Sequence, residues 1–155
     1  DFTSDIQDYM KRQHNILVGE RTAEQIKIEV GSAVLDLENP PDDYFVHGRD
    51  LMTGLPKQIP VTYQEIAQAL DKSISKIEEA IKSALEQTPP ELSADIYKTG
   101  IYLAGGGALL RGLDKRISAQ TQLPVHIAED PLHAVAKGTA ISLKNIDRFP
   151  FLMRD

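Results

Sequence analysis

Apolar residues recur every three or four positions over several stretches of the chain, which is the spacing of one buried helical face. Phe2, Ile6, Tyr9 and Met10 follow this spacing and Gly19 comes after them, so a helix is expected from residue 1 to about 18. The longest stripe predicts one long helix, or two stacked end to end, and is ended by the prolines of "QTPPEL". It consists of Ile66, Leu70, Ile74, Ile77, Ile81 and Leu85.

Two capping boxes mark expected helix starts. In such a box a threonine hydroxyl and a Glu or Gln side chain three residues later satisfy free backbone N–H groups. Thr22 and Gln25 have this spacing and predict a second helix that runs to about Gly31. Thr62 and Glu65 predict the start of the long helix.

The segment between these helices has a different character. It is rich in Pro, Gly and Asp and carries short alternating apolar stretches, which predict strands near 33–38, 43–48 and 57–62. After the long helix the pattern predicts shorter elements. They are a helix over 91–98, a strand over 101–103, a helix over 108–121 with a break at Gly112, a strand over 124–128 and a helix over 132–143.

This order of elements predicts two subdomains. The α/β elements at the two ends of the chain enclose a β-hairpin and a long helix. We therefore expect a larger α/β subdomain made of 1–32 and 91–155, with a smaller α+β subdomain of 33–90 inserted into it. A length of 155 residues suits one compact domain or two small ones.

Composition removes several classes of function. The chain has no cysteine, which excludes a disulfide scaffold, a thiolate metal site and a cysteine nucleophile. Its net charge of −6, with scattered Lys and Arg, argues against nucleic-acid binding. No apolar run approaches the roughly 20 residues that span a bilayer. No nucleophile–base pair is evident, so no catalytic residue is assigned. Metal-ligand spacing is missing among the histidines, which are His14, His47, His126 and His133.

Two segments raise the question of a nucleotide. Gly105–Gly107 lie between an apolar strand and a helical pattern, where glycines let backbone amides approach a ligand. Because the segment lacks the Gly-x-Gly-x-x-Gly spacing and a Walker lysine, a sharp corner is the commoner explanation. Glu24 and Lys27 share a helical face. They are typical of a solvated surface pair, but a carboxylate could also accept from ribose hydroxyls while a lysine stem covers a base.

Four segments taken together resemble the bacterial actins of the MreB family. They are "NILVGERTAEQIKIEVGSA", "QTPPELSADI", "LAGGGALLRGL" and "PVHIAEDPLHAVAKGTA", in the family's order and spacing over nearly the whole chain. The chain opens without methionine, as a piece of a longer protein does, and "RFPFLMRD" resembles a natural C-terminus. The resemblance therefore implies the second lobe of such a protein, with an α/β fold of the actin-like ATPase (ribonuclease H-like) type and an inserted α+β subdomain.

The resemblance also implies which residues face a nucleotide. Residues on the second helix would face the ribose and base, and the glycine segment would form the adenosine loop. They are Glu24, Gln25, Ile26, Lys27, Gly105, Gly106, Gly107 and Ala108. ATP or ADP with Mg²⁺ is expected only in the full-length protein, because both phosphate loops would lie upstream of Asp1. This chain alone is expected to bind no nucleotide tightly and to show no ATPase activity.

A filament-forming protein that sets rod cell shape is what the family implies. Its filaments would lie in the cytoplasm beneath the inner membrane and organise wall synthesis, with subunits joined head to tail. Leu51, Met52 and Leu55 in a turn suggest a contact surface, although they could fold back onto the core. A RodZ-type membrane protein is a family partner, and membrane contact would come from the absent first lobe. The alternatives are another actin-fold ATPase, such as a sugar kinase or an Hsp70-like chaperone, and a nucleotide-free interaction module.

Overall fold

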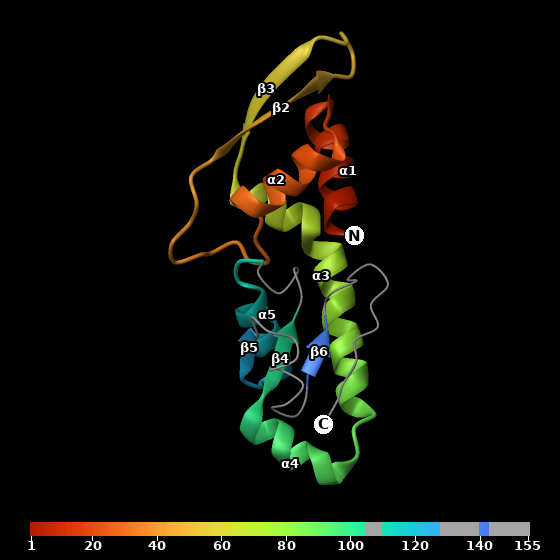
Figure 1. The fold of residues 1–155 in the computed structure, drawn as a ribbon, viewed down its shortest axis with the longest axis vertical. Coiled ribbons are helices and arrows are strands. Elements are labelled where there is room, and N and C mark those ends of the chain that lie inside the picture. The colour runs from red at the N-terminus through yellow and green to blue at the C-terminus, as the bar shows by residue number, and fades with distance from the viewer. Residues whose placement is uncertain (105–109, 128–139, 143–155) are drawn as a thin grey trace. The chain divides into compact units, whose positions relative to one another are not determined.

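The chain divides into two compact units, Asp1–Ser73 and Ile74–Asp155, which are drawn in Figure 1. The computed structural model describes residues 1–104, 110–127 and 140–142. Both units combine helices with a three-stranded sheet, so the mixed α/β character expected from the sequence is present. The boundary between the units falls within one long helix, α3 (Tyr63–Glu86).

The first unit is built on an antiparallel sheet in the order β1-β2-β3. Its elements before α3 are α1 (Phe2–His14), β1 (Ile16–Leu17), α2 (Glu20–Val30), β2 (Tyr44–Asp50) and β3 (Pro56–Val61). The periodic apolar faces of the helices and one face of the sheet form its core. Fully buried side chains there are Ile6, Met10, Ile16, Ile26, Val46, Val61, Ile66 and Leu70.

The first helix is shorter than the periodicity predicts. It ends at His14 because Asn15 adopts the left-handed conformation (φ 52°) and donates its N–H to the carbonyl of Met10. The next two residues form β1, which pairs with the end of β2. Gly48 allows this approach, since a Cβ there would lie 2.6 Å from the carbonyl oxygen of Leu17.

The predicted strand over 33–38 is wrong, whereas the two strands after it are confirmed as β2 and β3. No strand is present within 33–38. The Ser32 hydroxyl makes a local turn there, accepting from the N–H of Val34 at 3.1 Å and donating to its carbonyl at 2.7 Å. Local side-chain bonding of this kind competes with a strand ladder.

The two predicted capping boxes have different outcomes. The hydroxyl of Thr62 accepts from the N–H of Glu65 at 3.2 Å, and the Glu65 carboxylate accepts from the N–H of Thr62 at 3.1 Å, so α3 begins as predicted. The box at Thr22 is wrong, because α2 already begins at Glu20 after Gly19 and has no side-chain cap. The long stripe lies on one continuous helix and is buried as far as Ile81.

The second unit contains a parallel sheet in the order β5-β4-β6. Its further elements are α4 (Pro90–Thr99), β4 (Ile101–Ala104), α5 (Leu113–Thr121), β5 (Val125–Ile127) and β6 (Ala140–Ser142). The helix predicted over 108–121 begins only at Leu113, after Gly112 with φ 76°; residues 110–112 are not helical, and 108–109 lie outside the described part of the chain. The helix predicted over 132–143 is wrong at 140–142, which pair with β4 instead. Residues 132–139 and 143 lie outside the described part of the chain.

An ion pair joins two helices of this unit. The guanidinium of Arg116 on α5 donates twice to one oxygen of Glu78 on α3, at 3.1 and 2.9 Å, and once to Ser75 at 3.1 Å. Both charged side chains are largely shielded from solvent. Hydrogen bonds between ionised groups are stronger than neutral ones, so this contact helps to hold α5 against α3.

The division of the chain differs from the predicted subdomains. Residues 1–32 fall in the same compact unit as the hairpin, and the boundary lies after Ser73 instead of at 32 and 90. The physical reason is the pairing of β1 with β2, which makes the N-terminal segment part of the hairpin's own sheet. A strand of two residues is too short to show an alternating pattern, so its pairing could not be predicted from the sequence.

Candidate functional site

The predicted polar face on α2 carries an ion pair supported by a third residue. The Lys27 ammonium lies 3.0 Å from Oε1 of Glu24, and the Thr3 hydroxyl on α1 donates to Oε2 of the same carboxylate at 3.1 Å. The Glu24 side chain is 47% exposed and that of Lys27 is 22% exposed. The carboxylate is thus anchored at both oxygens while half of its side chain still faces solvent.

These contacts set the charge of the group. The hydrogen bond from Lys27 lowers the pKa of Glu24 most strongly, and the attraction of the Lys27 charge and the Thr3 hydroxyl add to the effect. Partial burial acts in the opposite direction and is outweighed. The carboxylate is therefore ionised at neutral pH and can only accept hydrogen bonds, which suits a partner that offers hydroxyl groups.

The other two residues predicted on this helix point elsewhere. The Ile26 side chain is fully buried, so it belongs to the core and cannot line a surface for a ligand. Gln25 is exposed and donates to Glu29 one turn later, at 2.9 Å. Of the predicted segment, the structure brings Glu24 and Lys27 together and adds Thr3, which the sequence analysis did not identify. Thr3 lies 21 positions away, and no local pattern connects it to α2.

The glycine half of the predicted site, which consists of Gly105, Gly106, Gly107 and Ala108, lies outside the described residues. The strand before them, β4, is described to its end, and its residues Ile101 and Leu103 are fully buried. The strand that precedes the segment is therefore part of the core of its unit.

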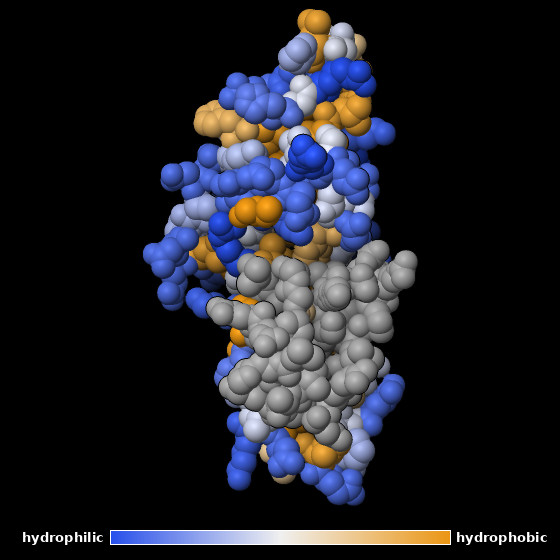
Figure 2. Space-filling model, viewed as in Figure 1, coloured by the Kyte–Doolittle hydropathy of each residue, from blue (hydrophilic) through white to orange (hydrophobic). Residues whose placement is uncertain are grey.

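The hairpin between β2 and β3 exposes the predicted apolar residues. The exposed fractions are 41% for Leu51, 83% for Met52 and 63% for Leu55. Figure 2 shows the corresponding hydrophobic colour at the end of the hairpin, at the top of the view. These side chains do not fold back onto the core, so that alternative is excluded by their exposure. We call Leu51, Met52 and Leu55 the hairpin tip.

Polar groups hold the backbone under the hairpin tip. The Asp50 carboxylate accepts from the N–H groups of Met52 and Thr53 at 2.8 and 3.0 Å and pairs with Lys57 at 3.4 Å. The backbone N–H of Thr53, then that of Met52, lowers the pKa of Asp50. The Leu51 N–H donates to the carbonyl of Asn15, which ties the tip to the end of α1. Hydrogen bonds within the hairpin and to the end of α1 therefore hold the conformation of the turn.

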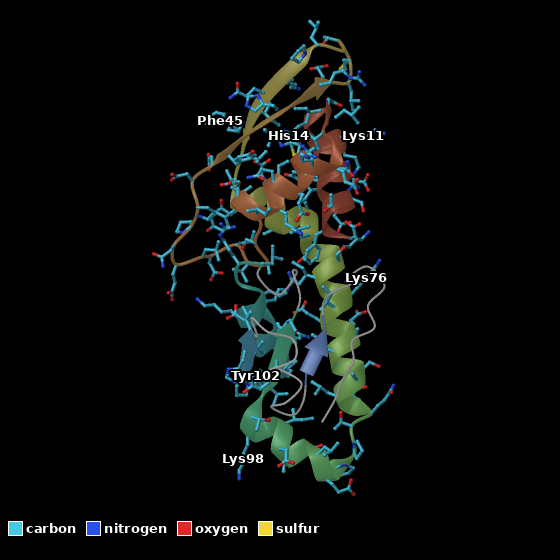
Figure 3. The ribbon with its side chains drawn as sticks, in the orientation of Figure 1. Lys11, His14, Phe45, Lys76, Lys98 and Tyr102 are labelled. Atoms are coloured by element: carbon cyan, nitrogen blue, oxygen red, sulfur yellow. The ribbon has the colours of Figure 1, made fainter. Side chains whose placement is uncertain are left out.

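A second cluster, which the sequence analysis missed, joins α1 to the start of α3. One oxygen of Glu65 lies 2.7 Å from Nε2 of His14 and accepts from the Tyr9 hydroxyl at 3.1 Å. Burial, followed by the Glu65 charge, raises the pKa of Tyr9 to about 12. Figure 3 labels His14 next to the sheet, and the Lys57 ammonium donates to its carbonyl at 2.9 Å. Only the capping box at Glu65 gave a sequence signal for this cluster.

In the described part of the chain, no three His, Cys, Asp or Glu side chains gather closely enough to hold a metal ion. Among the same residues, no helix is both long and apolar enough to cross a membrane. His126 lies against the ring of Tyr102, with ring centroids 4.9 Å apart, and His133 is outside the described residues. An open groove of about 690 Å³ beside α5 contains none of the predicted site residues.

Comparison with known proteins identifies the family. A profile described as "MreB/Mbl protein" matches residues 1–150. The chain belongs to the MreB/Mbl family. The cell shape-determining protein Mbl of Bacillus cereus is 48% identical over 149 residues, which cover 96% of this chain and 44% of that protein. MreB of Escherichia coli is 44% identical, over 94% of this chain and 42% of its own length. The chain thus spans less than half the length of these MreB/Mbl relatives.

Solved structures agree with this family. MreB5 of Spiroplasma citri, solved with ADP and with AMPPNP, is 40% identical and superposes with TM-scores of 0.80 and 0.79 over 88% of this chain. A MamK mutant bound to AMPPNP, at 19% identity and a TM-score of 0.65, supports the fold alone. The α/β fold of the actin-like type predicted from the sequence is confirmed, and so is the resemblance to the MreB family.

Proposed function

We propose that this chain is the second lobe of an ATP-binding, filament-forming bacterial actin that determines rod cell shape. The observation that carries the proposal is the family match over residues 1–150. Support also comes from the relatives named as cell shape-determining proteins and from the nucleotide-bound MreB5 structures. The sugar kinase, chaperone and nucleotide-free module are not favoured by any of these similarities.

In this proposal the chain supplies the adenosine half of the nucleotide site. The ionised Glu24 carboxylate would accept hydrogen bonds from the ribose hydroxyls. The partly shielded Lys27 would cover the base with the aliphatic part of its side chain. The glycine segment with Ala108 would let the backbone approach adenosine, as in the family. Mg²⁺ would neutralise phosphate charge in the first lobe, which this chain does not contain. ATPase activity is accordingly proposed for the two-lobed protein and not for this chain alone.

The hairpin tip is proposed as one face of a head-to-tail filament contact. Its three apolar side chains are held outward by a turn that its own polar groups stabilise. Repeating such a heterologous contact extends an open filament instead of closing a ring. The isolated chain should stay monomeric in dilute solution, because a tip of this size falls short of the area of a stable interface.

Cell-level roles follow from the same proposal. The filaments would lie in the cytoplasm beneath the inner membrane and organise cell-wall synthesis. Membrane contact would come from the first lobe, and a RodZ-type membrane protein is the proposed partner of the second. These assignments rest on the family, whose relatives carry cell-shape names.

Filament formation by the two-lobed protein tests the proposed function. We expect ATP or AMPPNP to shift the purified protein into the pellet on centrifugation and to give filaments in negative-stain electron microscopy. Samples without nucleotide provide the control. A protein that binds neither ATP nor ADP and forms no filaments at any nucleotide concentration would overturn the proposal.

A further inference from the structure

Two donors from different helices hold the Glu24 carboxylate. Lys27 approaches Oε1 from one turn further along α2, while Thr3 approaches Oε2 from the first turn of α1. All three residues belong to the first compact unit. A surface ion pair on one helix needs only the Lys27 contact, so the ion pair does not explain the second anchor.

The two anchors fix the orientation of the carboxylate. A glutamate held at one oxygen can still turn about its last side-chain bond, a torsion that is broad in proteins. With the Thr3 hydroxyl on Oε2, that rotation is restrained. Each carboxylate oxygen has a second lone pair, so two acceptor directions remain available to a ligand. Two adjacent hydroxyl donors match such a fixed pair of acceptors.

We propose that Thr3 is a positioning residue that makes the site select ribose over 2′-deoxyribose. The inference rests on the proposed nucleotide function and goes beyond it, because it assigns a role to Thr3 and a sugar preference to the site. Thr3 does not touch the nucleotide in this scheme. It orients Glu24, and a sugar that lacks one hydroxyl leaves one oriented acceptor without its donor, which is how polar sites reject such analogues.

The test compares ADP with 2′-deoxy-ADP in the two-lobed protein. Isothermal titration calorimetry gives both dissociation constants, and their ratio is the sugar preference. For the unmodified protein we expect a preference of about tenfold for ADP, the scale of one hydrogen bond to a charged group. In Thr3→Val, which replaces the hydroxyl by a methyl group of similar size, the ratio should fall to about twofold.

Two control variants separate positioning from general damage. Thr3→Ser keeps a hydroxyl and should keep the preference. Thr22→Val makes the same chemical change on α2. Within the described part of the chain, the Thr22 hydroxyl forms no hydrogen bond. It should also leave the ratio unchanged. A merely structural role for Thr3 would weaken both ligands equally and would not move the ratio.

The outcomes distinguish this inference from the proposed function. If the unmodified protein binds no ADP, the proposed function fails. If it binds ADP without a sugar preference, or if Thr3→Val keeps the full preference, only the role of Thr3 is overturned. Thermal melting checks that each variant is folded. Thr3→Ala, which removes the hydroxyl and leaves a smaller side chain, replaces the valine variant if that protein does not fold, and the same ratio decides.

Discussion

The polar face of α2 and the hairpin tip are two exposed regions of the same unit. Polar side chains face solvent on α2, whereas apolar side chains face solvent at the tip. On α2 the apolar residues Ala23, Ile26 and Val30 are buried and the polar residues lie on the more exposed side, although Ile28 is 54% exposed. At the tip the polar groups of Asp50 and Thr53 bond to backbone N–H groups of the turn, which leaves Leu51, Met52 and Leu55 outside.

The difference bears on how each region should be interpreted. A satisfied polar pair such as Glu24 and Lys27 is stable without any ligand, so its presence alone does not require one. Exposing three apolar side chains to water on a turn does not stabilise the fold. Contiguous exposed apolar patches commonly mark interaction sites. The tip therefore argues for a partner more strongly than the pair argues for a nucleotide.

The largest expected effect comes from charging the tip. In the two-lobed protein, Leu51→Asp combined with Met52→Asp should abolish filaments, because two carboxylates would have to be buried in the contact. ATP binding should be unchanged. Pelleting and electron microscopy measure the filaments, and Leu35→Asp, at a side chain that is also half exposed, is the matched control. Normal filaments from the double variant would remove the tip from the interface.

The next effect separates core from site on α2. Ile26→Ala should lower the free energy of unfolding by about 2–5 kcal/mol, the usual cost of a cavity at a fully buried isoleucine. Urea denaturation followed by circular dichroism gives this value. Gln25→Ala on the exposed side should change it by about 0.5 kcal/mol or less. Equal effects of the two changes would contradict the burial of Ile26.

A smaller effect is expected from the ion pair itself. Lys27→Met keeps most of the stem and removes the charge, so the free energy of unfolding should fall by about 0.5 kcal/mol or less, as for other exposed pairs. The same denaturation measurement applies. Glu24→Gln serves as the partner variant in a double-mutant cycle. A coupling energy of several kcal/mol would show that the pair is a major structural element and not a surface contact.

The smallest effect concerns pH at the tip. Because the backbone N–H groups lower the folded-state pKa of Asp50, its contribution to the turn is present above the unfolded value of about 4 and is lost as pH falls through the folded value. The amide proton shifts of Met52 and Thr53 in NMR spectra should therefore titrate together, with a midpoint below about 4. Asp50→Asn should remove this titration. Amide shifts that titrate unchanged in that variant would assign the effect to another group.

Long periodic segments and local caps could be predicted from the sequence. The stripe of α3 and the Thr62–Glu65 box depend on residues three or four positions apart, so one segment contains all the information. β1 and β6 could not be predicted, because two or three residues become a strand only by pairing with a distant one. The alternation over 33–38 resembled a strand, but Ser32 gives that backbone a local partner.

In the candidate site, too, contacts between residues close in sequence could be predicted and contacts between distant residues could not. Glu24 and Lys27 are three residues apart, and the sequence predicted their shared face. Thr3 contacts Glu24 only because α1 packs on α2, which no local pattern encodes. Ile26 was assigned to the site because it belongs to the motif, whereas its burial follows from the apolar face that it shares with Ala23 and Val30.

Glu65 gives the first unit a mechanical property. One of its oxygens caps the start of α3, while the other accepts from Tyr9 in the middle of α1 and lies against His14 at its end. Opening either helix end therefore removes a bond from the other, so the two ends should open as one cooperative unit. His14 and Asn15 in turn carry backbone bonds from Lys57 and Leu51 of the hairpin. Tension applied at the hairpin would therefore be passed through these bonds to the end of α1 and, through Glu65, to the start of α3.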